Sequence, residues 1–281
     1  MSKSIHTYGL YRLKIEIKNL IKQILKINPK PIRDSHYINE IYEKLRKEKF
    51  ENLDSFSTPK DYFFDIPSKL NDGRIRYSLL NNKLVEGKSN QVNFMILEII
   101  EGIMKNTSCE NVIELGSGGG KNLLWFASKY KDIKFIGLEL NKTSVDLANT
   151  AAKKFKINNV EFYQCDLTNP EEYTKFLTKE TFVYSHHTLE EMPRIYKIPL
   201  NVIKESDVQV VALLEPIFMF SFSRIILDLA KRLRIFNRDR LIGLKRFSKI
   251  KLSKYFNIDL VDLGLGVKPE NPTTLLLLKR K

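Results

Sequence analysis

The stretch that decides the fold is Val112-Ile-Glu-Leu-Gly-Ser-Gly-Gly-Gly120, an apolar run that leads into a loop rich in glycine. The run from Val112 to Leu115 predicts a buried parallel strand, because strands that are covered on both faces read as nearly continuous apolar segments. Glycines at positions 116, 118 and 120 permit positive φ and let a ligand approach the backbone closely. Residues 121–130 then place apolar side chains at helical spacing, so the loop opens a helix N-terminus.

Two common phosphate-binding fingerprints do not fit this loop. A dinucleotide fingerprint needs glycine where Lys121 stands, and a P-loop needs Ser or Thr where Asn122 stands. The remaining pattern is E-x-G-x-G-x-G, from Glu114 to Gly120, and it resembles motif I of the class I S-adenosylmethionine-dependent methyltransferases. The resemblance implies an α/β fold with a doubly wound, seven-stranded and mostly parallel sheet of the Rossmann-like kind. It also implies S-adenosyl-L-methionine as the cofactor.

Later strands end in acidic residues at the intervals that this resemblance requires. Glu139 closes the apolar run 134–138, and an acidic residue about 20 positions beyond the glycine loop accepts ribose hydroxyls in nucleoside-binding sheets of this kind. In the resembled family, an Asp at the place of Asp166, after the run 160–164, takes the adenine amino group, and the neighbouring Leu167 packs on the ring. The predicted cofactor-binding residues are therefore Glu114, Gly116, Gly118, Gly120, Glu139, Leu140, Asp166, Leu167 and Ser185.

The chemistry is predicted after the apolar run 182–185, because ligands of open α/β sheets lie outside the carboxyl ends of the strands. An acceptor hydroxyl must lose its proton during methyl transfer, and histidine suits that task because its pKa lies near 6.5. The rate should then fall as the imidazole becomes protonated at acid pH. His186, His187 and Glu190 are predicted as catalytic, and Glu191 and Glu215 as substrate-binding. An open alternative is that one histidine packs beneath the cofactor while the other binds backbone.

The residues at the end of the predicted strand 182–185 narrow the class of acceptor. Ser-His-His-Thr, residues 185–188, replaces the N-P-P-Y type tetrapeptide of amino-directed methyltransferases. No Asp ends this strand, so no metal is predicted. Residues 187–193 and 214–216 look similar to segments of sugar and cell-surface glycan O-methyltransferases. This resemblance favours a small-molecule or glycan-type acceptor.

The net charge of +14 lies mainly in two segments. Residues 1–30 carry seven Lys/Arg against one acidic residue, and residues 221–255 carry eleven against two. The first segment reads as a basic amphipathic helix up to about residue 28. Such segments steer a protein toward anionic partners. An RNA-modifying methyltransferase is therefore the alternative function, although nucleic acid is the less favoured partner. Association with a membrane surface and simple solvation of the charges are also left open.

Length and composition predict one catalytic domain with additions. The 281 residues divide into a helical N-terminal extension, 1–88, and a methyltransferase domain, 89–281, which carries a basic insertion at about 217–255. Two cysteines and the lack of an apolar leader in the first residues favour the cytoplasm. The inner membrane surface stays an alternative location, and the oligomeric state is left open.

Overall fold

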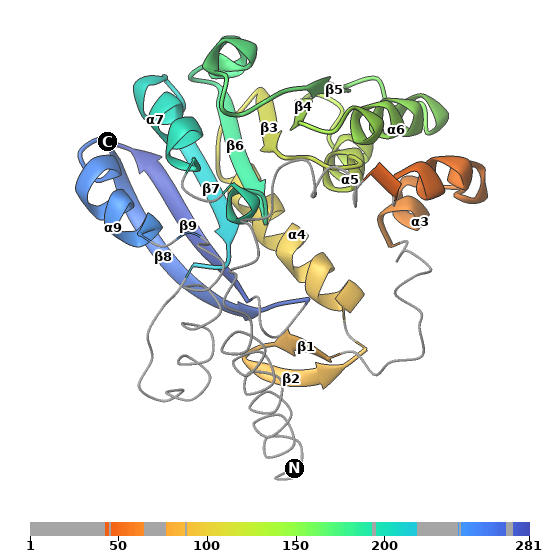
Figure 1. Cartoon of the computed structure of the whole chain (residues 1–281), viewed down its shortest axis with the longest axis horizontal. Helices are drawn as coiled ribbons and strands as arrows, with labels where there is room; N and C mark the ends of the chain where they lie inside the picture. The colour runs from red at the N-terminus through yellow and green to blue at the C-terminus, as the bar shows by residue number, and fades with distance from the viewer. Residues whose placement is uncertain are drawn as a thin grey trace, which may run out of the picture.

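The computed structural model describes residues 43–44, 46–64, 77–87, 89–192, 195–217, 241, 243–267 and 272–281. The predicted basic helix within residues 1–28 lies outside this part, as do residues 218–240 of the predicted insertion. Figure 1 shows the described elements as a sheet with helices on both sides.

The sheet has seven strands in the order β5-β4-β3-β6-β7-β9-β8. Strands β3 to β7 are parallel to one another, and β9 is antiparallel to both β7 and β8. The predicted doubly wound, mostly parallel sheet is therefore confirmed. The chain reverses its winding between β3 and β6, and open α/β sheets bind their ligands outside the carboxyl ends of the strands at such a point. The strands are β3 (Asn111–Leu115), β4 (Lys134–Glu139), β5 (Val160–Gln164), β6 (Thr181–His186), β7 (Val210–Glu215), β8 (Phe256–Leu265) and β9 (Thr273–Arg280).

Alternation along the strands divides the core into two layers, because successive side chains point to opposite faces. Val112 belongs to the cluster beneath one set of helices, whereas Ile113 belongs to the cluster on the other face. The first set contains α4 (Ser89–Lys105), α5 (Lys121–Lys129) and α6 (Lys142–Lys154). The second contains α7 (Lys197–Glu205), α9 (Leu244–Phe247) and the π-helical turn η7 (Ser248–Leu252). Short 3₁₀ turns lie at η3 (Pro170–Glu172), η4 (Thr174–Phe176) and η5 (Leu189–Glu191).

A β-hairpin lies within the stretch that was predicted as a helical extension. Strands β1 (Tyr77–Leu80) and β2 (Lys83–Glu86) pair antiparallel through a two-residue turn. Both turn residues, Asn81 and Asn82, have positive φ, as the common two-residue hairpin turns require. Leu79 also forms an isolated bridge with Gly266 beyond β8. The hairpin depends on this distant contact, and two-stranded hairpins are marginal alone, which explains why sequence pattern did not predict it.

The described part of the N-terminal extension forms a small helical unit that we call the cap, residues 43–44 and 46–64. It consists of a helix that continues to residue 51, the 3₁₀ turn η1 (Leu53–Ser55) and α3 (Pro59–Phe64). The described residues of the predicted helical extension are thus largely helical up to residue 64. Phe63 is buried and its ring lies 5.6 Å from that of Trp125 on α5, so the cap packs beside the glycine loop (Figure 1).

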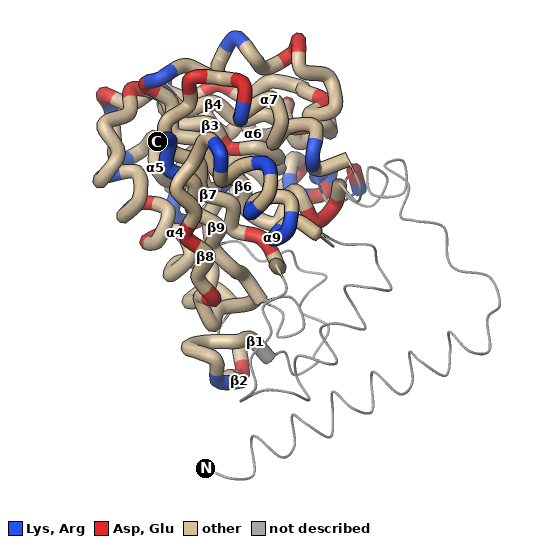
Figure 2. Tube along the Cα trace, turned by 90° about the vertical axis from the view of Figure 1, so that its left-hand side faces the viewer, with Lys and Arg blue, Asp and Glu red and all other residues tan. Residues whose placement is uncertain are grey.

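The end of the predicted basic insertion packs on the sheet. Leu244 and Leu252 are buried, whereas the basic side chains between them are exposed, and Figure 2 shows these residues at α9. A helix with one apolar face and one charged face is the usual arrangement at a protein surface. Among the described residues, no helix is long and apolar enough to cross a membrane.

Candidate cofactor and acceptor site

The glycine loop turns sharply between β3 and α5. Gly116, Gly118 and Gly120 have φ of 68°, 54° and 76°, in the left-handed region that side chains disfavour. A Cβ on Gly120 would lie 2.6 Å from the Phe162 ring, and one on Gly116 would collide with Thr188. The backbone conformation of the loop therefore requires glycine at these three positions. Gly120 is the N-cap of α5 and offers no side-chain hydrogen bond.

Glu139, at the end of β4, joins the glycine loop to the start of α6. Its Oε2 accepts from the backbone N–H of Gly118 at 2.8 Å, and its Oε1 accepts from that of Asn141 at 2.9 Å. Each carboxylate oxygen has a second lone pair, so both oxygens can still accept from a ribose hydroxyl. The position and chemistry of Glu139 fit the predicted ribose contact.

Glu114 lies beneath the loop rather than on its surface. Only 2% of the residue is exposed, and its Oε1 accepts from Asn122 Nδ2 at 2.6 Å. The Tyr184 hydroxyl on β6 interacts with the same carboxyl. Burial raises the pKa of this carboxyl to about 8. Glu114 therefore supports the loop from below as a neutral acid at pH 7, and its predicted contact with the cofactor stays a prediction.

Three predicted adenine-side residues have different surroundings. The Leu140 side chain is 41% exposed, which suits a flat apolar ring. Asp166 is half-buried, and its Oδ1 accepts from the backbone N–H and the hydroxyl of Thr168, both at 2.8 Å. Leu167 is only 6% exposed and packs in the core with Tyr173. Leu140 and Asp166 are thus open to a ligand, whereas most of Leu167 is already covered by protein.

Glu215, at the end of β7, organises the loop after β6. The side chain is fully buried, and its Oε1 accepts from the Ser185 hydroxyl at 2.7 Å. Its carboxylate also accepts from three backbone N–H groups, those of Thr188, Leu189 and Glu190, at 3.0 to 3.2 Å.

This geometry corrects two sequence predictions. Glu215 was predicted to bind substrate and Ser185 to bind cofactor, but both side chains have 0% exposure and bond to each other. A buried carboxylate with four donors has no accessible surface for a ligand, so both residues shape the site from within. Burial raises the pKa of Glu215 to about 7.

The two histidines differ sharply. His187 has φ of +57° and lies between two partners: its Nδ1 is 2.6 Å from Glu190 Oε1, and its Nε2 is 2.9 Å from Thr273 Oγ1. Glu190 is 4% exposed and Thr273 is fully buried. The predicted pairing of a glutamate with an imidazole is therefore present, but it fixes His187 in the structure. Glu191 lies half-buried at the end of η5.

His186 is the histidine without such fixation. It ends β6, is half-buried, and its ring nitrogens have no hydrogen bond within the described part of the chain. The rings of His186 and His187 lie edge to face at 5.1 Å. Burial and the neighbouring His187 lower the pKa of His186 to about 3. His186 is therefore neutral at physiological pH, and the predicted fall in rate through protonation near 6.5 does not apply to it.

Sequence reasoning missed several residues that complete the site. Asn122 holds Glu114, Thr188 packs on Gly116, and Thr273 binds His187 from a strand 86 residues away. Asn122 had a local signal, because it lies on the first turn of the helix that follows the loop. The other two contacts depend on how distant strands meet. Among the described residues, no group of three or more His, Cys, Asp or Glu could hold a metal ion.

Comparison with known proteins agrees with this geometry. A family model described as a methyltransferase domain matches residues 106–215. Over 59 residues, 21% of each chain, the sequence is 41% identical to the release factor glutamine methyltransferase of Buchnera aphidicola subsp. Baizongia pistaciae. Over 55 residues, 20% of this chain and 26% of the relative, it is 33% identical to the tRNA (guanine-N(7)-)-methyltransferase of Prochlorococcus marinus.

A solved structure supports the fold. The methyltransferase domain of bacterial CtHen1-C is 14% identical and covers 67% of this chain and 98% of that chain, with a TM-score of 0.51. This chain spans only 15–26% of the length of the curated relatives that it matches. The family model spans the glycine loop and strands β3 to β7. Residues 106–215 therefore match a methyltransferase domain in sequence and have a fold of that kind, and S-adenosylmethionine is the cofactor that this match implies.

Proposed function

We propose that this protein transfers a methyl group from S-adenosylmethionine to a hydroxyl of a small-molecule or glycan-type acceptor beside His186. The observation that carries the proposal is the state of that imidazole. It lies at the carboxyl end of β6, next to the switch point of the sheet, and burial keeps it neutral. A neutral imidazole nitrogen accepts a hydrogen bond, and a hydroxyl is a group that donates one.

The cofactor supplies a methyl group on a sulfonium, and the protein holds it against the acceptor. Glu139 would accept hydrogen bonds from the ribose hydroxyls, Leu140 and the exposed edge of Leu167 would border the adenine, and Asp166 would bind its amino group. His186 would accept a hydrogen bond from the acceptor hydroxyl and so orient its oxygen toward the methyl group. Because the pKa of His186 is about 3, the imidazole would not keep the proton, which would pass to water as the oxygen is methylated. Such alignment of two reactants supplies much of the rate enhancement in displacement reactions.

His187 acts on the acceptor side as a positioning residue. Glu190 and Thr273 hold its ring, and Glu215 holds the backbone on its C-terminal side. These contacts fix the direction in which His186 leaves the strand. Glu191 follows on the same loop, and we propose it as a contact for acceptor hydroxyls.

The experiment is to find the acceptor. Extracts are incubated with the protein and S-adenosylmethionine labelled in the methyl group, and the glycan, small-molecule, lipid, protein and RNA fractions are scored by mass spectrometry. Label on oxygen in a glycan or small molecule is the expected result, and it should disappear with His186→Gln. Label confined to nitrogen atoms or to RNA would overturn the hydroxyl assignment.

An RNA acceptor is the second candidate, and one surface favours it. Five basic residues are exposed on and after α9, and the sequence has no Asp or Glu from residue 240 to residue 258; the five are Lys245, Arg246, Lys249, Lys251 and Lys254 (Figure 2). Binding of RNA through this surface should weaken steeply with salt, because phosphate contacts release counterions. The same charges would bind an anionic membrane surface, so flotation with anionic vesicles is the parallel measurement.

A further inference from the structure

The cap lies directly against the cofactor loop, although it is outside the matched domain. Two of its side chains contact adjacent glycines. The Tyr62 hydroxyl donates to the carbonyl of Gly119 at 2.6 Å. Arg46 Nη2 lies 3.0 Å from the point where a Cβ would stand on Gly118, and its Nη1 lies 3.4 Å from the same point on Gly119. A guanidinium group is therefore placed on the loop that holds the cofactor.

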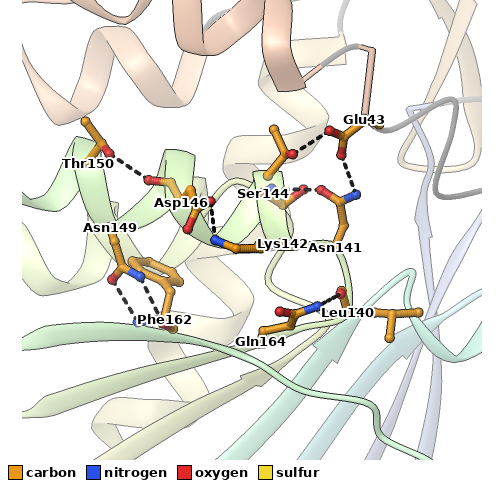
Figure 3. Close-up of polar contacts among 11 residues, drawn as sticks. Glu43, Leu140, Asn141, Lys142, Ser144, Asp146, Asn149, Thr150, Phe162 and Gln164 are labelled. Atoms are coloured by element: carbon orange, nitrogen blue, oxygen red, sulfur yellow. Dashed lines mark hydrogen bonds and ion pairs between the residues drawn. The ribbon is translucent and has the colours of Figure 1, made fainter.

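Glu43, one turn earlier on the same helix, joins that helix to the start of α6. Its Oε1 accepts from the Thr143 hydroxyl at 2.6 Å, and its Oε2 accepts from Asn141 Nδ2 at 3.0 Å (Figure 3). These bonds lower the pKa of Glu43, so the group is a carboxylate at neutral pH. It lies at the N-terminus of α6, where the helix dipole favours negative charge. Asn141 in turn binds Glu139, so the cap is connected to the predicted ribose site.

Further contacts hold the cap together and join it to the end of α6. Lys49 is 7% exposed, and its Nζ donates to the carbonyl oxygen of Tyr62 at 3.2 Å and lies 3.9 Å from the centre of that ring. Asp54 forms an ion pair with Lys154 at the end of α6, at 3.0 Å. The helix that carries the half-buried Arg46 is thus joined to α6 through Glu43 and packed against α3 through Lys49.

The cofactor has one anionic group, the carboxylate of its methionine part. Gly118 already donates its N–H to Glu139, so the loop itself is next to a negative charge and needs a cation to accept a second carboxylate. Arginine matches a carboxylate with two parallel donors. We infer that Arg46 binds the carboxylate of the methionine part and that the cap closes the cofactor site. This inference requires S-adenosylmethionine as the cofactor and does not depend on the identity of the acceptor.

Calorimetric titration with two ligands tests the inference. S-adenosylhomocysteine carries the carboxylate, and 5′-methylthioadenosine lacks the whole amino-acid part. Arg46→Gln should raise the Kd for S-adenosylhomocysteine about 10- to 100-fold, the usual effect of losing a charged hydrogen bond. The Kd for methylthioadenosine should change less than about 3-fold. The matched control is Lys44→Gln, which makes the same change of charge at an exposed position of the same helix. It should alter neither of the two Kd values.

The outcomes separate the cap from the cofactor assignment. If Arg46→Gln weakens both ligands equally, or neither, the carboxylate contact is refuted. If the unaltered protein binds neither ligand, the cofactor assignment fails instead. If Arg46→Gln does not fold, Arg46→Lys is used, and a several-fold loss confined to S-adenosylhomocysteine is expected. Hydrogen exchange gives an independent readout, because residues 46–64 should gain more protection with S-adenosylhomocysteine than with methylthioadenosine, and equal protection would contradict the inference.

Discussion

Replacing Glu114 by Gln should stabilise this protein at alkaline pH, although Glu114 is the acidic residue of the cofactor motif. The side chain is 2% exposed, and burial raises its pKa from 4.5 to about 8. Gln keeps the shape, and its carbonyl can accept from Asn122 as Glu114 Oε1 does. Its amide can donate where the acid would carry its proton, so the substitution removes mainly the ability to ionise.

The magnitude follows from the two pKa values. In the unfolded chain Glu114 loses its proton near pH 4.5, whereas the folded protein keeps it until about pH 8. The folded state therefore binds one more proton in this window, and the free energy of unfolding falls as pH rises through it. Each pKa unit between the folded and unfolded states corresponds to about 1.4 kcal/mol. The free energy of unfolding of the unaltered protein should therefore fall by about 3 to 5 kcal/mol relative to that of Glu114→Gln.

Urea unfolding of both proteins from pH 5 to pH 9 measures this difference. The two free energies should agree within about 1 kcal/mol at pH 5, and Glu114→Gln should be the more stable protein at pH 9. Contributions from other groups, including Glu215, cancel because both proteins share them. Glu110→Gln, at an exposed glutamate just before β3, is the matched control and should show no such divergence. Parallel curves for Glu114→Gln would show that the buried carboxyl ionises normally, and the reasoning would be refuted.

Three further substitutions test other parts of the site. His186→Gln should lower turnover about 10²-fold without changing the Kd for S-adenosylhomocysteine, and the unaltered protein should show no fall in rate near pH 6.5 from this residue, whose pKa is about 3. A larger effect of this substitution on the Kd than on turnover would contradict the role of His186 in orienting the acceptor. Glu215→Ala should cost at least about 3 kcal/mol of stability at pH 6, because it leaves four donors unmatched. Denaturant unfolding measures it, and a cost under about 1 kcal/mol would disprove the loop-organising role. Gly120→Ala should cost more than about 2 kcal/mol through strain at φ +76° and the Phe162 contact, whereas Gly102→Ala in α4 meets no atom within 4 Å and should be neutral or stabilising.

The sheet could be predicted from local pattern because its strands are continuous apolar runs. Each of the four apolar runs predicted from the sequence, 112–115, 134–138, 160–164 and 182–185, is a strand, and the acidic residue at the end of β4 lies where the interval placed it. Parallel strands end at one edge, so an apolar run followed by a polar residue already indicates which residues share a site. The β1–β2 hairpin had no such signal, since it is completed by the bridge between Leu79 and Gly266.

Within the site, sequence determined which residues stand at the strand ends but not which of them face a ligand. The sequence does not distinguish His186 from His187. Only the positions of Glu190 and Thr273 in the fold decide that the His187 ring is held while the His186 ring is not. Glu215 looked like a substrate contact until the fold buried it under the backbone of residues 188–190. The approach of Arg46 to the glycine loop likewise joins segments about 70 residues apart. The pattern that predicts a strand depends on neighbouring residues in the sequence. The burial, pKa and hydrogen-bond partners of a side chain depend on segments that meet only after folding.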